Sequence, residues 1–92
     1  MPTLRIPTPL RSYTSGQSEV DLSGNTVGEI MNDLVTQYPA LRPHLFNGQN
    51  QLRPFVNLFV NEENIREIDG LATPLLEGDR VMLIPSIAGG RA

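Results

Sequence analysis

The chain has 92 residues, a hydrophobic fraction of 39% and a formal net charge of −3. This length suits one domain with a single modest core, and it excludes a cofactor domain joined to a substrate domain. No apolar run approaches the length of a membrane span, and the acidic balance does not favour nucleic-acid binding.

The side-chain chemistry of the chain is narrow. It has no cysteine, which excludes disulfides, thiolate metal sites, iron–sulfur clusters and a cysteine nucleophile. All seven basic residues are arginine, so no lysine amine can attack an activated acyl group. We prefer compositional drift over selection against self-reaction as the cause. The first residues show no secretory signal, and we expect a cytoplasmic protein.

The N-terminal segment is predicted to form a β-hairpin. Apolar and polar residues alternate around Leu4 and Ile6, which predicts a first strand that runs into a loop at Pro7. Residues 15–18 supply a turn of glycine and polar residues. Alternation around Val20 then predicts a second strand with one polar face, which pairs back on the first.

The next segment carries the strongest local pattern. Apolar residues recur at three-and-four spacing over residues 27–38, which predicts an amphipathic helix. Thr26 and Glu29 form a capping box at its start, because each side chain can accept a hydrogen bond from a backbone N–H there. Pro39 disfavours helix at Tyr38, so the helix is predicted to end at that residue.

A loop is predicted at about residues 40–54, followed by a strand. Leu41, Leu45 and Phe46 are the expected anchors of the loop to the body of the domain. Residues 55–60 alternate within an apolar run and predict the third strand.

The last part of the chain is predicted to add two more strands. A turn at residues 61–64 leads to a short strand near 65–67, and an irregular connection at 70–77 follows. Residues 80–84 form the last strand. Because this strand is apolar on both faces, we expect it in the middle of the sheet.

The element order predicts the fold class. Two strands, a helix and three further strands are typical of an α+β protein with a β-grasp (ubiquitin-like) architecture, a mixed five-stranded sheet with one main helix covering one face. The first and last strands are expected side by side and parallel in the centre. We expect residues 1–92 to form a single domain with a flexible C-terminal tail at about 86–92.

Several short segments, taken in order, resemble a known family. They are Ile6-Pro7-Thr8, Phe55-Val56-Asn57, Phe59-Val60-Asn61, Gly70-Leu71-Ala72-Thr73, Gly78-Asp79 and Ala88-Gly89-Gly90. Together they resemble the ubiquitin-like sulfur carriers of the ThiS/MoaD family, which serve thiamin, molybdopterin and cysteine synthesis. The resemblance covers nearly the whole chain and is strongest to the carriers of thiocarboxylate-dependent cysteine biosynthesis.

The resemblance implies a carrier that is not itself an enzyme and binds no cofactor. An adenylating enzyme of the ubiquitin-activating type would use ATP to adenylate the Gly90 carboxylate, which a sulfur donor would convert to a thiocarboxylate. A sulfur-accepting enzyme, such as a cysteine synthase, would then take the sulfur. Gly89 and Gly90 have no side chains, which suits a narrow channel in the partner.

Two residues follow the second glycine, whereas members of the family generally end at it. Gly90 is joined to Arg91 by a peptide bond and so has no free carboxylate. We therefore interpret the chain as a precursor from which a processing hydrolase removes Arg91 and Ala92.

A candidate docking patch for the adenylating enzyme lies on the predicted third strand. Alternate residues of that strand should face the helix, so Phe55 and Phe59 are expected on the opposite face of the sheet. Met82, Ile84 and Ile87 would extend this apolar patch. The alternative is that the long loop before the strand folds over the aromatic side chains.

Other polar residues give no catalytic or metal site. His44 is the only histidine and lacks the companions that a metal site or a catalytic triad requires. Glu62, Glu63, Glu67 and Asp69 form an acidic cluster, which we interpret as a solvated sheet edge rather than a metal site.

Several functional interpretations stay open at this point. Carriers for molybdopterin or thiamin synthesis would use the same Gly-Gly ending as a carrier for cysteine synthesis. A ubiquitin-like binding module could dock through its sheet and never be activated. An enzyme in its own right is disfavoured, because the sequence shows no nucleophile–base pair or metal cluster.

Overall fold

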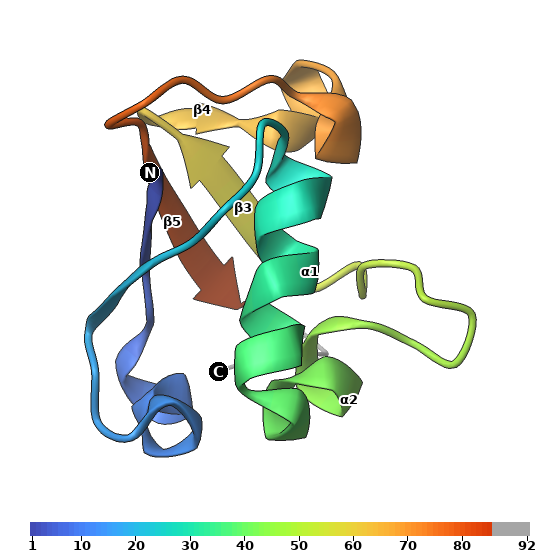
Figure 1. Ribbon diagram of the computed structural model, residues 1–92. Coiled ribbons are helices and arrows are strands. Elements are labelled where there is room, and N and C mark those ends of the chain that lie inside the picture. The colour runs from blue at the N-terminus through green and yellow to red at the C-terminus, as the bar shows by residue number, and fades with distance from the viewer. Residues whose placement is uncertain (86–92) are drawn as a thin grey trace.

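The computed structural model describes residues 1–85 of the chain as a sheet with helices packed on one side (Figure 1). The strands are β1 (Thr3–Arg5), β2 (Glu19–Asp21), β3 (Val56–Val60), β4 (Glu63–Asn64) and β5 (Arg80–Pro85). The α-helices are α1 (Val27–Gln37) and α2 (Arg42–Leu45). The predicted tail at residues 86–92 lies outside the described residues.

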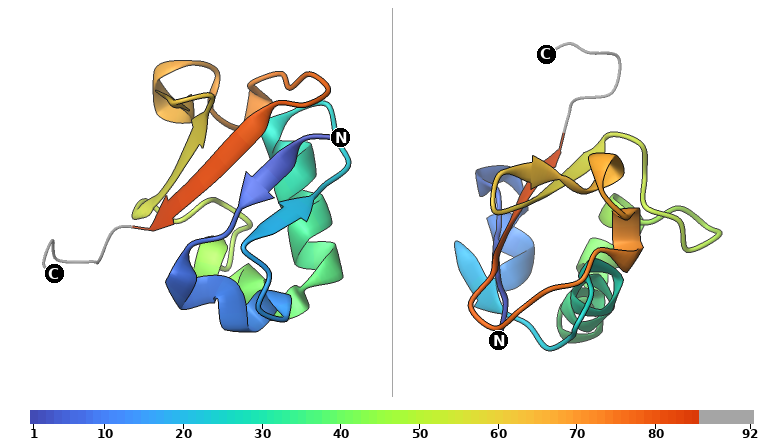
Figure 2. Two further views of the ribbon diagram at one scale, coloured as in Figure 1. Left: turned by 90° about the vertical axis from the view of Figure 1, so that its left-hand side faces the viewer. Right: turned by 90° about the horizontal axis from the view of Figure 1, so that it is seen from above.

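The sheet has the predicted mixed arrangement. Its five strands lie in the order β2-β1-β5-β3-β4, so the last strand is central. β5 runs parallel to β1 and antiparallel to β3, and Figure 2 shows β1 and β5 side by side. The central position of the last strand and its parallel pairing with the first are confirmed.

The hydrophobic core lies between α1 and one face of the sheet. Leu4, Leu58, Val81 and Leu83 occupy inward positions on β1, β3 and β5 and are buried. The helix meets them with five buried residues, which are Val27, Ile30, Met31, Leu34 and Val35. Full burial of one such side chain stabilises the fold by about 1.5–3 kcal/mol, so this layer is the main source of stability.

Both ends of α1 follow the predicted signals. The Glu29 N–H donates to Thr26 Oγ1 at 3.2 Å, and Glu29 Oε1 accepts from the Asn25 N–H at 2.7 Å. The capping box is therefore present, with its carboxylate bonded one residue before the N-cap. The helix ends at Gln37, and Pro39 opens a 3₁₀ turn.

Two predicted loops contain helical turns. Residues 8–14 form a 3₁₀ helix in which Leu10 and Thr14, four residues apart, are both buried. In the loop at 40–54, α2 buries Leu45 four residues after the buried Leu41. Both segments begin with a proline in the first turn, where its fixed φ suits a helical start. The expected anchors Leu41, Leu45 and Phe46 are buried, as predicted.

The prediction of a short strand near residues 65–67 is wrong. The fourth strand lies at Glu63–Asn64, and Ile65–Glu67 forms a 3₁₀ turn. The cause is Asn64, whose Oδ1 accepts a hydrogen bond from the Arg66 N–H at 2.9 Å and so caps a helical turn. The irregular connection predicted at 70–77 is confirmed, with a single 3₁₀ turn at Gly70–Ala72.

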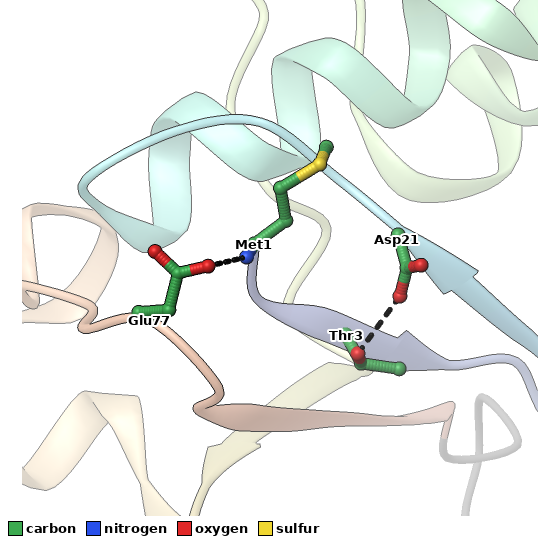
Figure 3. A network of polar contacts seen from close by, with 4 residues as sticks. All are labelled: Met1, Thr3, Asp21 and Glu77. Atoms are coloured by element: carbon green, nitrogen blue, oxygen red, sulfur yellow. Dashed lines mark hydrogen bonds and ion pairs between the residues drawn. The ribbon is translucent and has the colours of Figure 1, made fainter.

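Polar contacts tie the start of β1 to its surroundings (Figure 3). The Met1 amine donates to Glu77 Oε2 at 2.7 Å, and the Thr3 hydroxyl donates to Asp21 Oδ1 at 2.9 Å. The hydrogen bond from the Met1 amine and its positive charge lower the pKa of Glu77. Within residues 1–85, no helix is long and apolar enough to cross a membrane.

Candidate functional site

The face of the sheet opposite α1 presents side chains outward from the central strands. On β5, Arg80, Met82 and Ile84 alternate with the buried Val81 and Leu83. Met82 and Ile84 are each 42% exposed, which is high for large apolar side chains on the central strand of a sheet. Strand alternation has therefore produced a second apolar surface, and α1 does not cover it.

The register places polar and apolar side chains in rows across this face. Met82 pairs with Phe59 on β3 and with Arg5 on β1. Arg5 in turn pairs with Glu19 on β2. One row thus runs from an acid at the edge of the sheet to an aromatic ring near its other edge.

These rows border a groove with a volume of about 540 Å³, which we call the open-face groove. The apolar side chains that face it are Phe59, Met82 and Ile84. Its polar lining is Thr3, Arg5, Glu19, Asn61, Glu62 and Arg80. An apolar centre within a polar and charged rim is the usual anatomy of a protein–protein interface.

The rim charges differ in their pairing. Arg5 Nη1 lies 3.6 Å from Glu19 Oε2, and both side chains are about half exposed, at 54% and 41%. Such an exposed pair contributes about 0–1 kcal/mol, so a partner could replace it at little cost. Within residues 1–85, neither the Arg80 guanidinium nor the Glu62 carboxylate has an ion pair or a hydrogen bond. Two opposite charges on the rim are therefore available to a partner.

Glu62 belongs to the turn that joins β3 to β4. Val60 pairs with Glu63, which leaves Asn61 and Glu62 as a two-residue connection with φ of 48° and 79°. Positive φ at both positions is the geometry of a type I′ turn, in which asparagine followed by glycine is preferred. A left-handed conformation costs a non-glycine residue about 1–2 kcal/mol, so Glu62 occupies a position that favours glycine.

The turn is fixed against the start of β5. The Asn61 N–H donates to the Arg80 carbonyl at 3.0 Å, and the Arg80 N–H donates to Asn61 Oδ1 at 3.3 Å. Asn61 Nδ2 also donates to Asp79 Oδ1 at 3.2 Å. These contacts hold Glu62 beside Arg80 at one end of the groove. Sequence reasoning misses this placement and assigns Glu62 to an acidic edge.

The structure brings together part of the predicted docking patch. Phe59, Met82 and Ile84 share the open-face groove, and no residue of the loop at 40–54 lines it. Phe55 does not belong with them. It lies in a turn before β3 and packs, half-buried, against the core. Phe55 precedes β3, which begins at Val56, and it does not line the groove, so its part in docking stays a prediction.

The remaining predicted residues of the patch and the carrier tail cannot be placed on the sheet. Ile87, Gly89 and Gly90 lie outside the described residues, as do Arg91 and Ala92. β5 ends at Pro85 beside Ile84, so these residues follow directly from the open-face groove along the chain. Their roles stay predictions.

The other polar candidates match their expected surface positions. His44 is exposed, and its ring centroid lies 4.7 Å from that of Tyr13. Glu63, Glu67 and Asp69 are exposed, as expected of a solvated edge. In the part of the chain that the structure describes, no group of three His, Cys, Asp or Glu side chains could hold a metal ion.

Comparison with known proteins relates nearly the whole chain to one family. Residues 4–90 match the ThiS family. The sulfur carrier protein CysO of Mycobacterium tuberculosis is 41% identical over 90 residues, which cover 96% of this chain and 97% of CysO. The crystal structure of that CysO superposes with a TM-score of 0.85 at 38% identity, over 95% of this chain and 100% of CysO.

Two further solved structures share the fold. A chain from the crystal structure of the Amycolatopsis orientalis BexX/CysO complex has a TM-score of 0.87 at 34% identity, and the match covers 98% of this chain and 100% of that one. The small archaeal modifier protein 1 of Methanosarcina acetivorans has a TM-score of 0.85 at 29% identity, over 97% and 95% of the two chains.

These matches agree with the architecture and with the resemblance found in the sequence. The mixed five-stranded sheet crossed by one long helix is the ubiquitin-like β-grasp fold. The family match spans β1 to β5 and continues to Gly90. The chain therefore belongs to the ThiS family, and it is a sulfur carrier protein of the CysO type, a carrier and not an enzyme.

Proposed function

We propose that the chain carries sulfur as a thiocarboxylate on Gly90, that the sulfur serves cysteine biosynthesis, and that Arg91 and Ala92 are removed first. One observation carries the proposal above all. The family match ends at Gly90, the second residue of a Gly-Gly pair, and leaves Arg91 and Ala92 outside it. Cysteine biosynthesis is favoured because the short segments from Ile6 to Gly90 resemble the carriers of that pathway, and because the chain is 41% identical to the sulfur carrier protein CysO over 90 residues.

Loading of the carrier takes two steps on a partner enzyme. The freed Gly90 carboxylate attacks the α-phosphorus of ATP, which yields an acyl-adenylate and releases pyrophosphate. Sulfur from a donor then attacks the carbonyl carbon, and AMP leaves. A carboxylate is a poor electrophile until adenylation supplies this leaving group, so ATP is required by the partner, not bound by the carrier.

The length of chain after β5 couples docking to chemistry. Gly90 is the fifth residue after Pro85. At full extension this length of chain spans at most about 18 Å, so the partner's ATP site must lie within that distance of the end of β5. A surface beside Ile84 is therefore well placed to hold the adenylating enzyme while Gly90 enters its nucleotide site. Gly89 and Gly90 leave room for close approach of the partner's backbone.

The open-face groove supports a protein partner. Its apolar centre, formed by Phe59, Met82 and Ile84, and its charged rim suit an enzyme surface, with Ile87 extending the contact. A CysO protein has been crystallised in complex with BexX, which supports a partner of this kind. A sulfur-accepting cysteine synthase and a processing hydrolase complete the set of partners. Because adenylation consumes ATP, the proposed location is the cytoplasm.

Intact-mass measurement tests the proposal. The full chain, a chain ending at Gly90 and the same shortened chain with Gly90→Ala are each incubated with the adenylating enzyme, ATP, Mg²⁺ and sulfide. We expect only the chain ending at Gly90 to gain the mass of one oxygen-to-sulfur exchange. Equal adenylation of the full chain would refute the precursor, and an unloaded Gly90-ending chain would refute the carrier chemistry.

The same loaded chain identifies the acceptor. It is offered separately to a cysteine synthase and to the sulfur-accepting enzymes of molybdopterin and thiamin synthesis. We expect loss of the thiocarboxylate mass together with cysteine formation in the first reaction only. Transfer in either of the other reactions would instead assign the chain to that pathway. A binding module that is never activated would show no loading and would bind its partner equally well after Gly90→Ala.

A further inference from the structure

The turn between β3 and β4 places a charged residue where glycine is preferred. Glu62 has φ of 79° at the second position of a two-residue hairpin connection. Glycine takes this conformation without a steric penalty, whereas a side chain there is unfavourable. Such a position persists only where the surrounding structure holds it, and it is more frequent at functional sites than elsewhere.

The surroundings of Glu62 supply a second, independent observation. Its side chain lines the open-face groove together with the apolar Phe59 and Met82 and the charged Arg80. Glu62 is exposed and, within residues 1–85, its carboxylate bonds to nothing. The carboxylate therefore contributes no contact to the fold that would offset the unfavourable conformation. A contact between the Glu62 carboxylate and a partner would explain why glutamate occupies this position.

We infer that Glu62 is a specificity-determining residue of the docking surface, whose carboxylate pairs with a basic side chain of the adenylating enzyme. Arg80 provides the opposite charge at the same end of the groove and pairs with an acidic side chain of that enzyme. The inference rests on the proposed function and adds to it the charge pattern of the enzyme surface: an apolar side chain between Phe59 and Met82, flanked by one basic and one acidic group.

The two unpaired charges would fix the orientation of the bound enzyme as well as contribute to its affinity. An apolar patch alone would accept an enzyme surface in several orientations, because the hydrophobic effect is not directional. Opposite charges at fixed places on the rim favour one orientation and disfavour wrong partners. The orientation matters here because Gly90 can reach only a short distance beyond β5. Glu62 would thus help to align the chain with the ATP site.

Substitutions at Glu62 separate a binding role from a purely structural one. Glu62→Gly and Glu62→Gln are made in the chain that ends at Gly90, with Glu67→Gln as a control that removes the same charge from an exposed site outside the groove. The measurements are Tm of the carrier and the KM and kcat of ATP–pyrophosphate exchange by the adenylating enzyme at two salt concentrations.

We expect Glu62→Gly to raise Tm by about 2–6 °C, because glycine fits the turn. It should also raise KM roughly three- to tenfold, with kcat unchanged. Glu62→Gln should raise KM similarly, leave Tm nearly unchanged and weaken the salt dependence. Glu67→Gln should behave as the wild type in both measurements.

The outcomes distinguish this inference from the function on which it rests. Normal exchange with the unsubstituted chain ending at Gly90, together with an unchanged KM in both Glu62 variants, would overturn the inference and leave the carrier function intact. A higher Tm for Glu62→Gly without a higher KM would likewise overturn the inference alone. Absence of exchange with the unsubstituted chain ending at Gly90 would overturn the proposed function and the inference together.

Discussion

Phe59 and Met82 lie directly opposite each other on β3 and β5, on the face of the sheet that α1 leaves uncovered. The next pair in the same register, Val60 and Val81, is buried on the inner face. A slip of one residue between these strands would exchange the two sets, so the core pairing also fixes the outward apolar surface. The same strand pairing thus places the core residues on one face of the sheet and the proposed docking residues on the other.

Met82→Glu tests whether the uncovered face of the sheet binds the adenylating enzyme. A charge in the apolar centre of the groove must be desolvated when the enzyme docks, so we expect the KM for adenylation of the chain ending at Gly90 to rise at least tenfold. Met82 is 42% exposed in the free carrier. The free energy of unfolding should therefore change by less than about 1 kcal/mol, measured by urea denaturation.

Leu76→Glu is the matched control for Met82→Glu. Leu76 is 74% exposed and lies outside the open-face groove, so the same kind of change there alters exposed apolar surface without touching the groove. We expect a KM equal to that of the wild type. A similar loss of activity with both variants would show that the effect comes from surface charge in general and not from docking.

Neighbouring residues of β5 allow a test of the inward side. Leu83 is buried opposite Leu58, whereas Ile84 points into the groove and is 42% exposed. We expect Leu83→Ala to lower the free energy of unfolding by about 2–5 kcal/mol, because it leaves a cavity in the core. Ile84→Ala should cost less than about 1 kcal/mol. Equal destabilisation in urea titrations would contradict the assignment of the two faces.

Periodicity is sufficient to predict four of the five strands, β1, β2, β3 and β5, and the long helix. Alternation on β3 and β5 predicts that Phe59, Met82 and Ile84 face away from the core, and the structure confirms that placement. Side chains that alternate in sequence must alternate in space, so this information is local. The groove follows because α1 is the one long helix of the described chain and covers a single face.

The errors arose where one polar side chain or one short spacing decided the structure. Asn64 caps a helical turn and so ends β4 early, which apolar periodicity at Ile65 does not reveal. The four-residue spacing of Leu41 and Leu45 indicates the helix α2, but the neighbouring prolines favoured a loop in the prediction. The position of Glu62 depends on hydrogen bonds between Asn61 and Arg80, which are distant in sequence. Such contacts require the assembled sheet.

Thr26→Ala tests the N-cap of α1. The Thr26 hydroxyl accepts a hydrogen bond from the Glu29 N–H, and alanine cannot replace it. We expect the free energy of unfolding to fall by about 1 kcal/mol. Thr36→Ala is the control, since Thr36 lies within α1 and donates to the Asn32 carbonyl. Alanine is a better helix former there, so we expect no loss. Equal losses in chemical denaturation would rule out a specific capping effect.

The contact between Met1 and Glu77 predicts a dependence of stability on pH. Because the Met1 amine lowers the pKa of Glu77, the folded chain binds the proton of this carboxyl more weakly than the unfolded chain does. The contact therefore stabilises the fold above the ordinary glutamate pKa of about 4.3, and its contribution disappears as the pH falls through the lowered pKa. We expect the Tm of Glu77→Gln to lie slightly below that of the wild type at about pH 7, with the two values converging as the pH falls through the lowered pKa of Glu77. Salt should reduce the difference at neutral pH, because both groups are exposed.

Glu67→Gln, at an exposed site without an ion pair in the described chain, should show no such convergence. A difference in Tm for Glu77→Gln that stays constant from neutral to acidic pH would mean that the ion pair does not contribute, and that the substitution acts through the loop before β5.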